Sequence, residues 1–278
     1  MQYTPFIPSE PPLHGRVDTL FILDDYEPEH PRERIVPDGT VNLIIELDGR
    51  ERFVFDNRTG EPLHSCRGSW ISGVHTNYLT IGDTSAGSTL AVTQFSLGRA
   101  RALLHQDLSE INDRVAPATE LLGNSVVRLR DQLLAAGSAG ERLAILDSYW
   151  TQRFDPTLDA PAVVQDAVNR LKLSPGEINI TQLVDDHREI SHRHFVALFK
   201  RHVGPTPKRL QRILRFAKVF EHIQAEEGVD WAQTSLELGY SDQAHFVREF
   251  VEFSGFRPQE YLKLGHDRSN FFPEDERS

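Results

Sequence analysis

Nine basic side chains gather in one short stretch of an otherwise acidic chain. The formal net charge of the whole sequence is −11, and residues 1–169 contain 14 Arg and no Lys against 24 Asp and Glu. Residues 188–218 reverse this balance, because Glu189 is their only acid. Their basic residues are Arg188, Arg193, Lys200, Arg201, Lys208, Arg209, Arg212, Arg215 and Lys218. Such a charge asymmetry predicts that one part of the chain binds a polyanion such as nucleic acid.

The basic stretch coincides with a pattern of two short helices. Residues 181–187 favour a first helix, Ser191 is a suitable N-cap, and residues 192–203 favour a second helix that Gly204 ends. Two helices joined by a turn of three or four residues are typical of a helix-turn-helix unit. One such unit alone is weak evidence, since many helical proteins contain the same turn.

The same pattern recurs about fifty residues later. Residues 231–238 favour a short helix that stops at Gly239, and residues 243–253 favour a second helix that ends at Gly255. Ser241 or Asp242 is expected to cap this second helix. The repetition makes a chance match far less plausible, and it indicates two helix-turn-helix units.

The apolar spacing of each second helix separates a buried side from an exposed side. At 100° per residue, the inward residues are Phe195, Phe199 and Val203 in the first unit and Phe246, Phe250 and Phe253 in the second. The outward residues are Arg193, Ala197, Lys200 and Arg201 in the first unit and Gln243, Ala244, His245 and Arg248 in the second. Arg can bind guanine through two hydrogen bonds, Gln can bind adenine likewise, and the Ala methyl can contact thymine. We therefore expect these side chains to read bases, although ordinary surface positions are the alternative.

A basic amphipathic helix is predicted between the two units, over residues 207–224. Thr206 is its expected cap, and Pro207 suits the first helical position. One face is apolar and carries Leu210, Ile213, Leu214, Ala217 and Phe220, with Lys208, Arg212 and Arg215 nearly opposite. This helix would pack against both units and turn its basic side to phosphate, which fixes the spacing of the recognition helices. The expected phosphate contacts are Ser191, Arg201, Lys208, Arg209, Arg212, Arg215 and Ser241.

The N-terminal part has a different periodicity. Six short apolar or alternating runs between residues 17 and 96 are separated by turn sequences, which predicts a small antiparallel β-barrel or sandwich. Helical periodicity follows up to residue 150. We therefore predict an α+β protein of two domains: a β-rich sensing domain at 1–155, a linker at 156–165, an all-α DNA-binding domain at 166–265 and a disordered tail at 266–278.

Residues 238–262, LGYSDQAHFVREFVEFSGFRPQEYL, resemble the second helix-turn-helix signature of the AraC/XylS family of bacterial transcription regulators, including Pro258 and Tyr261. Residues 195–214 are similar to that family's first recognition helix and the start of its connecting helix. The resemblance covers roughly residues 165–264 and implies a seven-helix DNA-binding domain that reads two adjacent major grooves. It places Arg193, His194 and Lys200 in one groove and Gln243, Ala244, His245 and Arg248 in the next.

The first unit departs from the family pattern at two places. Members commonly have a glycine in the turn where this chain has residues near Glu189, and they often have polar residues where it has Val196 and Ala197. We therefore expect the first unit to contribute phosphate contacts more than base contacts.

The N-terminal part also resembles the β-barrel sensor domain of one branch of this family, in residues 34–47 and in the stretch from 69 to 104. The resemblance implies an effector pocket inside the barrel. Asp38, Trp70, His75 and Tyr78 are our candidates for its lining, with core or turn roles as the alternative. The effector is an unidentified small molecule or protein.

Two other function classes are alternatives to a DNA-binding regulator. A metalloenzyme on a β-barrel would need converging histidines, but the N-terminal histidines are scattered and the usual catalytic motifs are absent, so no catalytic residue, metal or cofactor is expected. A protein-interaction regulator with a degenerate first unit stays open. No apolar run is long enough to span a membrane, and Cys66 is the only cysteine, so we expect a cytoplasmic protein. RNA polymerase and a second copy of the chain are further candidate partners. We expect an activator, with a repressor as the alternative.

Overall fold

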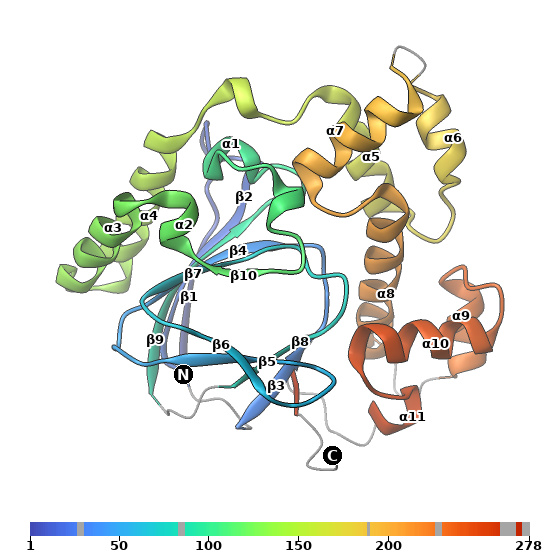
Figure 1. The fold of residues 1–278 in the computed structure, drawn as a ribbon, viewed down its shortest axis with the longest axis horizontal. Helices are drawn as coiled ribbons and strands as arrows, with labels where there is room; N and C mark the ends of the chain where they lie inside the picture. The colour runs from blue at the N-terminus through green and yellow to red at the C-terminus, as the bar shows by residue number, and fades with distance from the viewer. Residues whose placement is uncertain (27–30, 83–86, 188–189, 226–229, 262–270, 274–278) are drawn as a thin grey trace.

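A computed structural model describes residues 1–26, 31–82, 87–187, 190–225, 230–261 and 271–273. The turn near Glu189, where the first unit departs from the family pattern, lies outside these residues. The chain folds as a β-rich N-terminal part followed by a helical C-terminal part (Figure 1), which confirms the predicted α+β class.

Two antiparallel sheets form the N-terminal domain. The six-stranded sheet has the order β1-β2-β9-β4-β7-β10, and the five-stranded sheet has the order β11-β3-β8-β5-β6. The strands are β1 (Gln2–Phe6), β2 (Val17–Tyr26), β3 (Arg32–Ile35), β4 (Val41–Glu46), β5 (Arg52–Phe55), β6 (Pro62–Cys66), β7 (Ser69–Ser72), β8 (Leu79–Gly82), β9 (Ser88–Phe95), β10 (Val115–Pro117) and β11 (Phe271–Pro273). One face of the six-stranded sheet is turned toward the other sheet, and a cavity lies between them.

Helices cover the other face of the six-stranded sheet. They are α1 (Arg101–Leu104), α2 (Ala118–Leu122), α3 (Asn124–Ala135) and α4 (Ala139–Arg153), with 3₁₀ turns at Leu108–Glu110 and Pro156–Leu158. Trp150 on α4 is fully buried, packs edge-on against Phe95 and donates a hydrogen bond from Nε1 to Thr93 Oγ1 at 2.8 Å. Because the indole N–H finds a partner inside the core, this large side chain can be buried without an unsatisfied donor.

The C-terminal part contains seven helices among the described residues, the number that the family resemblance implies. They are α5 (Ala162–Leu173), α6 (Ile180–Asp185), α7 (His192–Val203), α8 (Pro207–Ala225), α9 (Trp231–Glu237), α10 (Gln243–Ser254) and α11 (Pro258–Tyr261). Ser191 caps α7 and Asp242 caps α10, each by accepting a hydrogen bond from the backbone N–H three residues later. Gly239 and Gly255 have positive φ of 74° and 75°, as their turn positions require.

The connecting helix α8 holds two separate apolar cores. Its first turn contributes Leu210 to the core of α5, α6 and α7. Further along, Ile213, Phe216 and Val219 join the core that α10 and α11 share, where the Phe216 ring lies 5.4 Å from that of Phe250. Figure 1 shows α8 running between the α6–α7 pair and the α9–α10 pair. The predicted apolar stripe is confirmed for Leu210, Ile213 and Phe220, which are buried, whereas Leu214 and Ala217 are partly exposed. Phe216 and Val219, which the prediction left out, are buried.

Two predicted boundaries are wrong. The segment predicted as a linker at 156–165 contains a 3₁₀ turn and the start of α5. Asp159 within it accepts hydrogen bonds from Arg16 and Arg99, which tie it to the N-terminal domain. The predicted disordered tail contains β11, which pairs with β3 through Phe271 and Ile35, whereas residues 266–270 and 274–278 lie outside the described residues. In both places, partners distant in sequence order a segment that has no periodicity of its own.

Two histidines are enclosed as neutral groups. Burial lowers the pKa of both His75 and His202 to about 4. Because an unfolded chain protonates histidine near its ordinary pKa of 6.5, the unfolded state binds more protons between about pH 6.5 and about pH 4. The contribution of each histidine to stability is therefore complete above pH 6.5 and falls as the pH drops toward 4.

We accordingly expect the free energy of unfolding to be lower at about pH 5 than at about pH 7.5. Urea denaturation at the two pH values measures the difference, and His202→Gln should reduce it because one of the two groups no longer titrates. An equal pH difference in the variant and in the natural chain would contradict the assignment to His202.

Candidate DNA interface

The outward side of α7 is a row of exposed polar and basic side chains. Arg193, His194, Lys200 and Arg201 are exposed, whereas Phe195, Phe199 and Val203 are fully buried. Ser191 is exposed and accepts a hydrogen bond from the His194 N–H at 3.3 Å. The helix thus has the two-sided form that its sequence predicts.

The outward side of α10 presents a smaller set. Gln243, Ala244, Arg248 and Ser241 are exposed. His245 is half-buried, because its ring forms a hydrogen bond with Ser241 at 3.1 Å and lies 3.4 Å from Glu249. Among the predicted base-reading residues of α10, His245 is therefore the one whose ring is engaged inside the domain.

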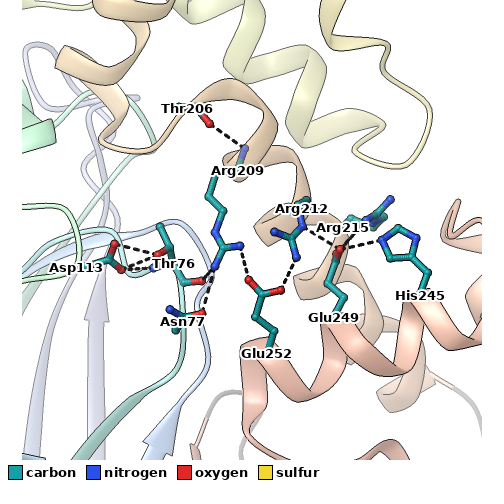
Figure 2. Close-up of polar contacts among 10 residues, drawn as sticks. All are labelled: Thr76, Asn77, Asp113, Thr206, Arg209, Arg212, Arg215, His245, Glu249 and Glu252. Atoms are coloured by element: carbon teal, nitrogen blue, oxygen red, sulfur yellow. Dashed lines mark hydrogen bonds and ion pairs between the residues drawn. The ribbon is translucent and has the colours of Figure 1, made fainter. Parts of the chain in front are cut away.

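A buried carboxylate joins α8 to α10. Glu249 is only 1% exposed, and it accepts hydrogen bonds from Arg212 Nε at 3.0 Å and from Arg215 Nη2 at 2.9 Å (Figure 2). Arg215 also stacks over the Tyr240 ring, with the guanidinium carbon 4.2 Å from its centre. Since a carboxylate can be buried only when charged partners compensate it, these arginines are structural partners of α10.

Glu252, one turn further along α10, binds the same side of α8. It pairs with Arg209 and Arg212, and Arg209 also donates to the carbonyl oxygen of Thr76 and to Asn77 Oδ1 in the N-terminal domain (Figure 2). Burial would raise the pKa of Glu252, but the hydrogen bonds from the two arginines hold it below its usual value. Arg209 therefore links α8, α10 and the N-terminal domain.

These contacts change the predicted role of the connecting helix. Lys208 is exposed, as a phosphate contact requires, whereas Arg209, Arg212 and Arg215 are half-buried and bound to carboxylates or to carbonyl oxygen. Glu249 and Glu252 are not among the site residues predicted from the sequence. A signal was present, because Glu249 lies next to the buried phenylalanines on the helical wheel of α10, where an acid needs a basic partner.

The turn between α5 and α6 touches the second helix-turn-helix unit directly. A Cβ atom on Gly239 would lie 2.8 Å from the carbonyl oxygen of Gly176, and one on Gly176 would lie 2.7 Å from that of Leu238. Only glycine permits this approach. Gln211 on α8 donates to the carbonyl oxygen of Ile178 at 2.6 Å. The separation of α7 and α10 is thus fixed by backbone contact as well as by α8.

The N-terminal domain contacts both units. Arg201 on α7 pairs with Asp107 at 3.3 Å. Arg34 on β3 donates to the Gly255 carbonyl oxygen at 3.2 Å and lies 4.5 Å from the centre of the Phe256 ring. Residues of the six-stranded sheet, of α1–α4 and of α8, α10 and α11 belong to one buried apolar cluster. The two halves therefore pack against each other with apolar and ionic contacts.

The cavity between the sheets has a volume of about 410 Å³. Asp38, Trp70 and His75 line it, as the effector-pocket prediction requires of them. Tyr78 does not line it. Its ring instead lies beside Gly255 and under the Arg34 guanidinium, at the contact between the domains.

Two negative findings concern the described residues. They contain no group of three or more His, Cys, Asp or Glu side chains arranged to hold a metal ion. Within the same ranges, no helix is long and apolar enough to cross a membrane.

The buried carboxylate yields a stability prediction. Glu249→Ala leaves Arg212 and Arg215 without their shared buried partner, and we expect it to lower the free energy of unfolding by about 3 kcal/mol. The matched control is Glu120→Ala, because Glu120 pairs with Arg114 at the surface, with both side chains about half exposed. We expect a change below about 1 kcal/mol there. Chemical denaturation compares the two, and equal losses would contradict a structural role for Glu249.

Two family models match separate parts of the chain. Residues 186–264 match a helix-turn-helix domain, which spans α7 to α11 and so contains both recognition helices. Residues 6–117 match a domain of unknown function, DUF6597, which spans β1 to β10. No curated protein sequence matches the chain.

Several solved structures are similar at low identity. An apo variant of ToxT from Vibrio cholerae has 10% identity and a TM-score of 0.47, with 88% of this chain and 97% of that chain covered. ToxT from the same organism bound to an unsaturated fatty acid has 10% identity and a TM-score of 0.43, with 92% and 96% covered. The C-terminal domain of AraT, a response regulator from Geobacillus stearothermophilus, has 16% identity and a TM-score of 0.35, with 43% and 93% covered.

At these scores the structural likeness supports no conclusion by itself. The helix-turn-helix match is different, because it falls on the two units whose caps, cores and exposed faces are described above. On that basis, the C-terminal part of the chain is a helix-turn-helix domain, in agreement with the AraC/XylS-type DNA-binding transcription regulator that the sequence predicts.

Proposed function

We propose that α7 and α10 enter two successive major grooves on one side of the duplex. The observation that carries this proposal is the fixed pairing of two exposed recognition faces by α8, by Glu249 and by the contact between Gly176 and Gly239. Successive major grooves lie about 34 Å apart along B-DNA, so a reader of both needs its two helices at a set distance. A rigid domain meets this need within one chain.

The two faces divide the work of recognition. On α10, Gln243 and Arg248 are exposed and have the hydrogen-bonding groups that read adenine and guanine, while Ala244 offers a methyl group to thymine. On α7, Arg193, His194 and Lys200 face the other groove. Phosphate contacts come from exposed groups, Ser191, Lys208 and Ser241, because these remain accessible in the packed domain.

The N-terminal domain modulates this activity by occupying cations of the DNA-binding domain. Arg201 is paired with Asp107, and Arg209 is bound to Thr76 and Asn77. Both arginines were expected to contact phosphate, and neither can do so fully while it holds the N-terminal domain. Release of the N-terminal domain, on binding of an effector in the cavity, would return both charges to DNA.

Base reading is tested with a duplex selected by the natural chain from a random library and with a scrambled duplex of the same length. Arg248→Ala should reduce the preference for the selected duplex by about 1–3 kcal/mol. Lys208→Ala serves as the phosphate control, since it should weaken binding to both duplexes equally and lower the salt slope by about one. Unchanged discrimination by Arg248→Ala would show that this side chain does not read bases.

Modulation by the N-terminal domain is tested with Arg34→Ala, which removes the hydrogen bond to Gly255 and the contact with Phe256. We expect affinity for both duplexes to rise, by up to about tenfold, because a lost charged hydrogen bond favours release of the domain. If Arg34→Ala acted only by removing a positive charge, DNA binding would weaken. The two explanations therefore predict opposite changes in affinity for DNA. Arg142→Ala controls for charge, because Arg142 pairs with Asp24 inside the N-terminal domain. Unchanged or weaker binding by Arg34→Ala would refute modulation through this contact.

A further inference from the structure

The cavity between the sheets has a polar end and an apolar body. Asn42 on β4 is paired in register with Gln94 on β9 and with Ser72 on β7, so the three form one polar row across the six-stranded sheet. Two residues further along, Ile44 is paired with Val92 and Trp70 in an apolar row. All six residues line the cavity. A ligand that fills this space must be apolar along most of its length and polar at one end.

The polar end keeps its hydrogen-bond donors occupied. Asn42 Nδ2 donates to Thr40 Oγ1 at 3.1 Å, and Thr40 donates to Asp38 Oδ1 from its hydroxyl at 2.7 Å and from its backbone N–H at 2.8 Å. This relay leaves the amide oxygen of Asn42 and the second carboxylate oxygen of Asp38 without a side-chain donor among the described residues. The groups that can still bind a ligand are chiefly hydrogen-bond acceptors. The Gln94 side chain can offer either its amide N–H groups or its amide oxygen.

No cation balances Asp38 within the described part of the chain. The carboxylate forms no ion pair there, and burial raises its pKa. His75 lies at the same end, with its ring 2.9 Å from the Ser72 hydroxyl, but burial lowers its pKa to about 4, so it is neutral at neutral pH. Arg52 pairs with Asp48 at 3.6 Å and lies over the Trp70 ring, at the apolar row.

We propose that the cavity binds a small, largely apolar molecule that carries a basic amine, with the amine against Asp38. An ammonium group brings both the donors and the positive charge that this end lacks, whereas a carboxylate would face Asp38 with like charge. The volume of about 410 Å³ is within the range of small-molecule sites. The inference rests on the proposed function, because it names the chemical class of the effector.

The amine would sit next to the connecting helix. Gly39, which follows Asp38 in the same turn, approaches α8 so closely that a Cβ atom there would lie 3.4 Å from Leu210 and 3.8 Å from Leu214. On the other side, His75 precedes Thr76, whose carbonyl oxygen binds Arg209 of α8. A ligand held by Asp38 therefore lies beside two of the segments through which the N-terminal domain contacts α8.

The test uses the full chain and three probes that share one phenyl ring: 2-phenylethylamine, 2-phenylethanol and 3-phenylpropanoate. Calorimetry and thermal shift should rank them with the amine tightest, by about tenfold over the alcohol, and the carboxylate weakest. Asp38→Asn should remove most of the amine preference, because Asn keeps an acceptor for Thr40 but loses the charge. Glu33→Gln is the matched control, since Glu33 also lines the cavity but is bonded to Tyr26 at 3.0 Å, and it should leave the ranking unchanged.

Three results would overturn the proposal: no saturable binding of the amine, carboxylate binding as tight as amine binding, or an amine preference that survives Asp38→Asn. The affinity of the ligand-free chain for the selected duplex is measured in parallel. If the ligand-free chain showed no affinity for the duplex, this result would count against the DNA-binding function and not against the amine site. The two failures are therefore distinguishable.

Discussion

The buried Glu249 carboxylate is the interaction on which the geometry of the DNA-binding domain depends. It is enclosed by Arg212 and Arg215 of α8, with His245 one turn away on its own helix. A buried charge is tolerated only in a geometry that keeps its partners within hydrogen-bond distance, so the pair holds α10 at a set position along α8. The contacts of Phe216 with Phe250 and Phe253 bury the apolar surface between α8 and α10. The ionic contacts determine the position of α10 along α8.

The same arginine row extends the constraint to the N-terminal domain. Arg209 lies one turn before Arg212 on α8 and divides its guanidinium between Glu252 and the Thr76–Asn77 segment. Arg34 at Gly255 and Arg201 at Asp107 also cross the contact between the domains. Guanidinium is suited to this position because its planar fork binds several acceptors at once. Part of the positive charge of the C-terminal domain is thus engaged in contacts within the protein.

The cavity lies beside the segments through which the N-terminal domain contacts α8. Its polar end is formed by residues that stand directly beside the segments touching α8, namely Asp38 before Gly39 and His75 before Thr76. A ligand that shifts the turn at Asp38–Gly39 or the loop at His75–Thr76 would therefore shift a segment that contacts the connecting helix. Packed interiors respond to such shifts by changing between discrete arrangements, because they deform little.

The sequence by itself determined the class of each half, the two helix-turn-helix units, their caps and the inward faces of α7 and α10. These features are local, since a helix is fixed by its apolar period and by its end residues. Three of the four candidates for the pocket lining, Asp38, Trp70 and His75, also lie at the cavity between the sheets. Only the tertiary structure decided that Arg209, Arg212 and Arg215 bind carboxylates or the N-terminal domain, that Tyr78 lies at the domain contact, and that residues 271–273 join a sheet. A helical wheel shows which side chains face outward, but it cannot show whether another element covers that side.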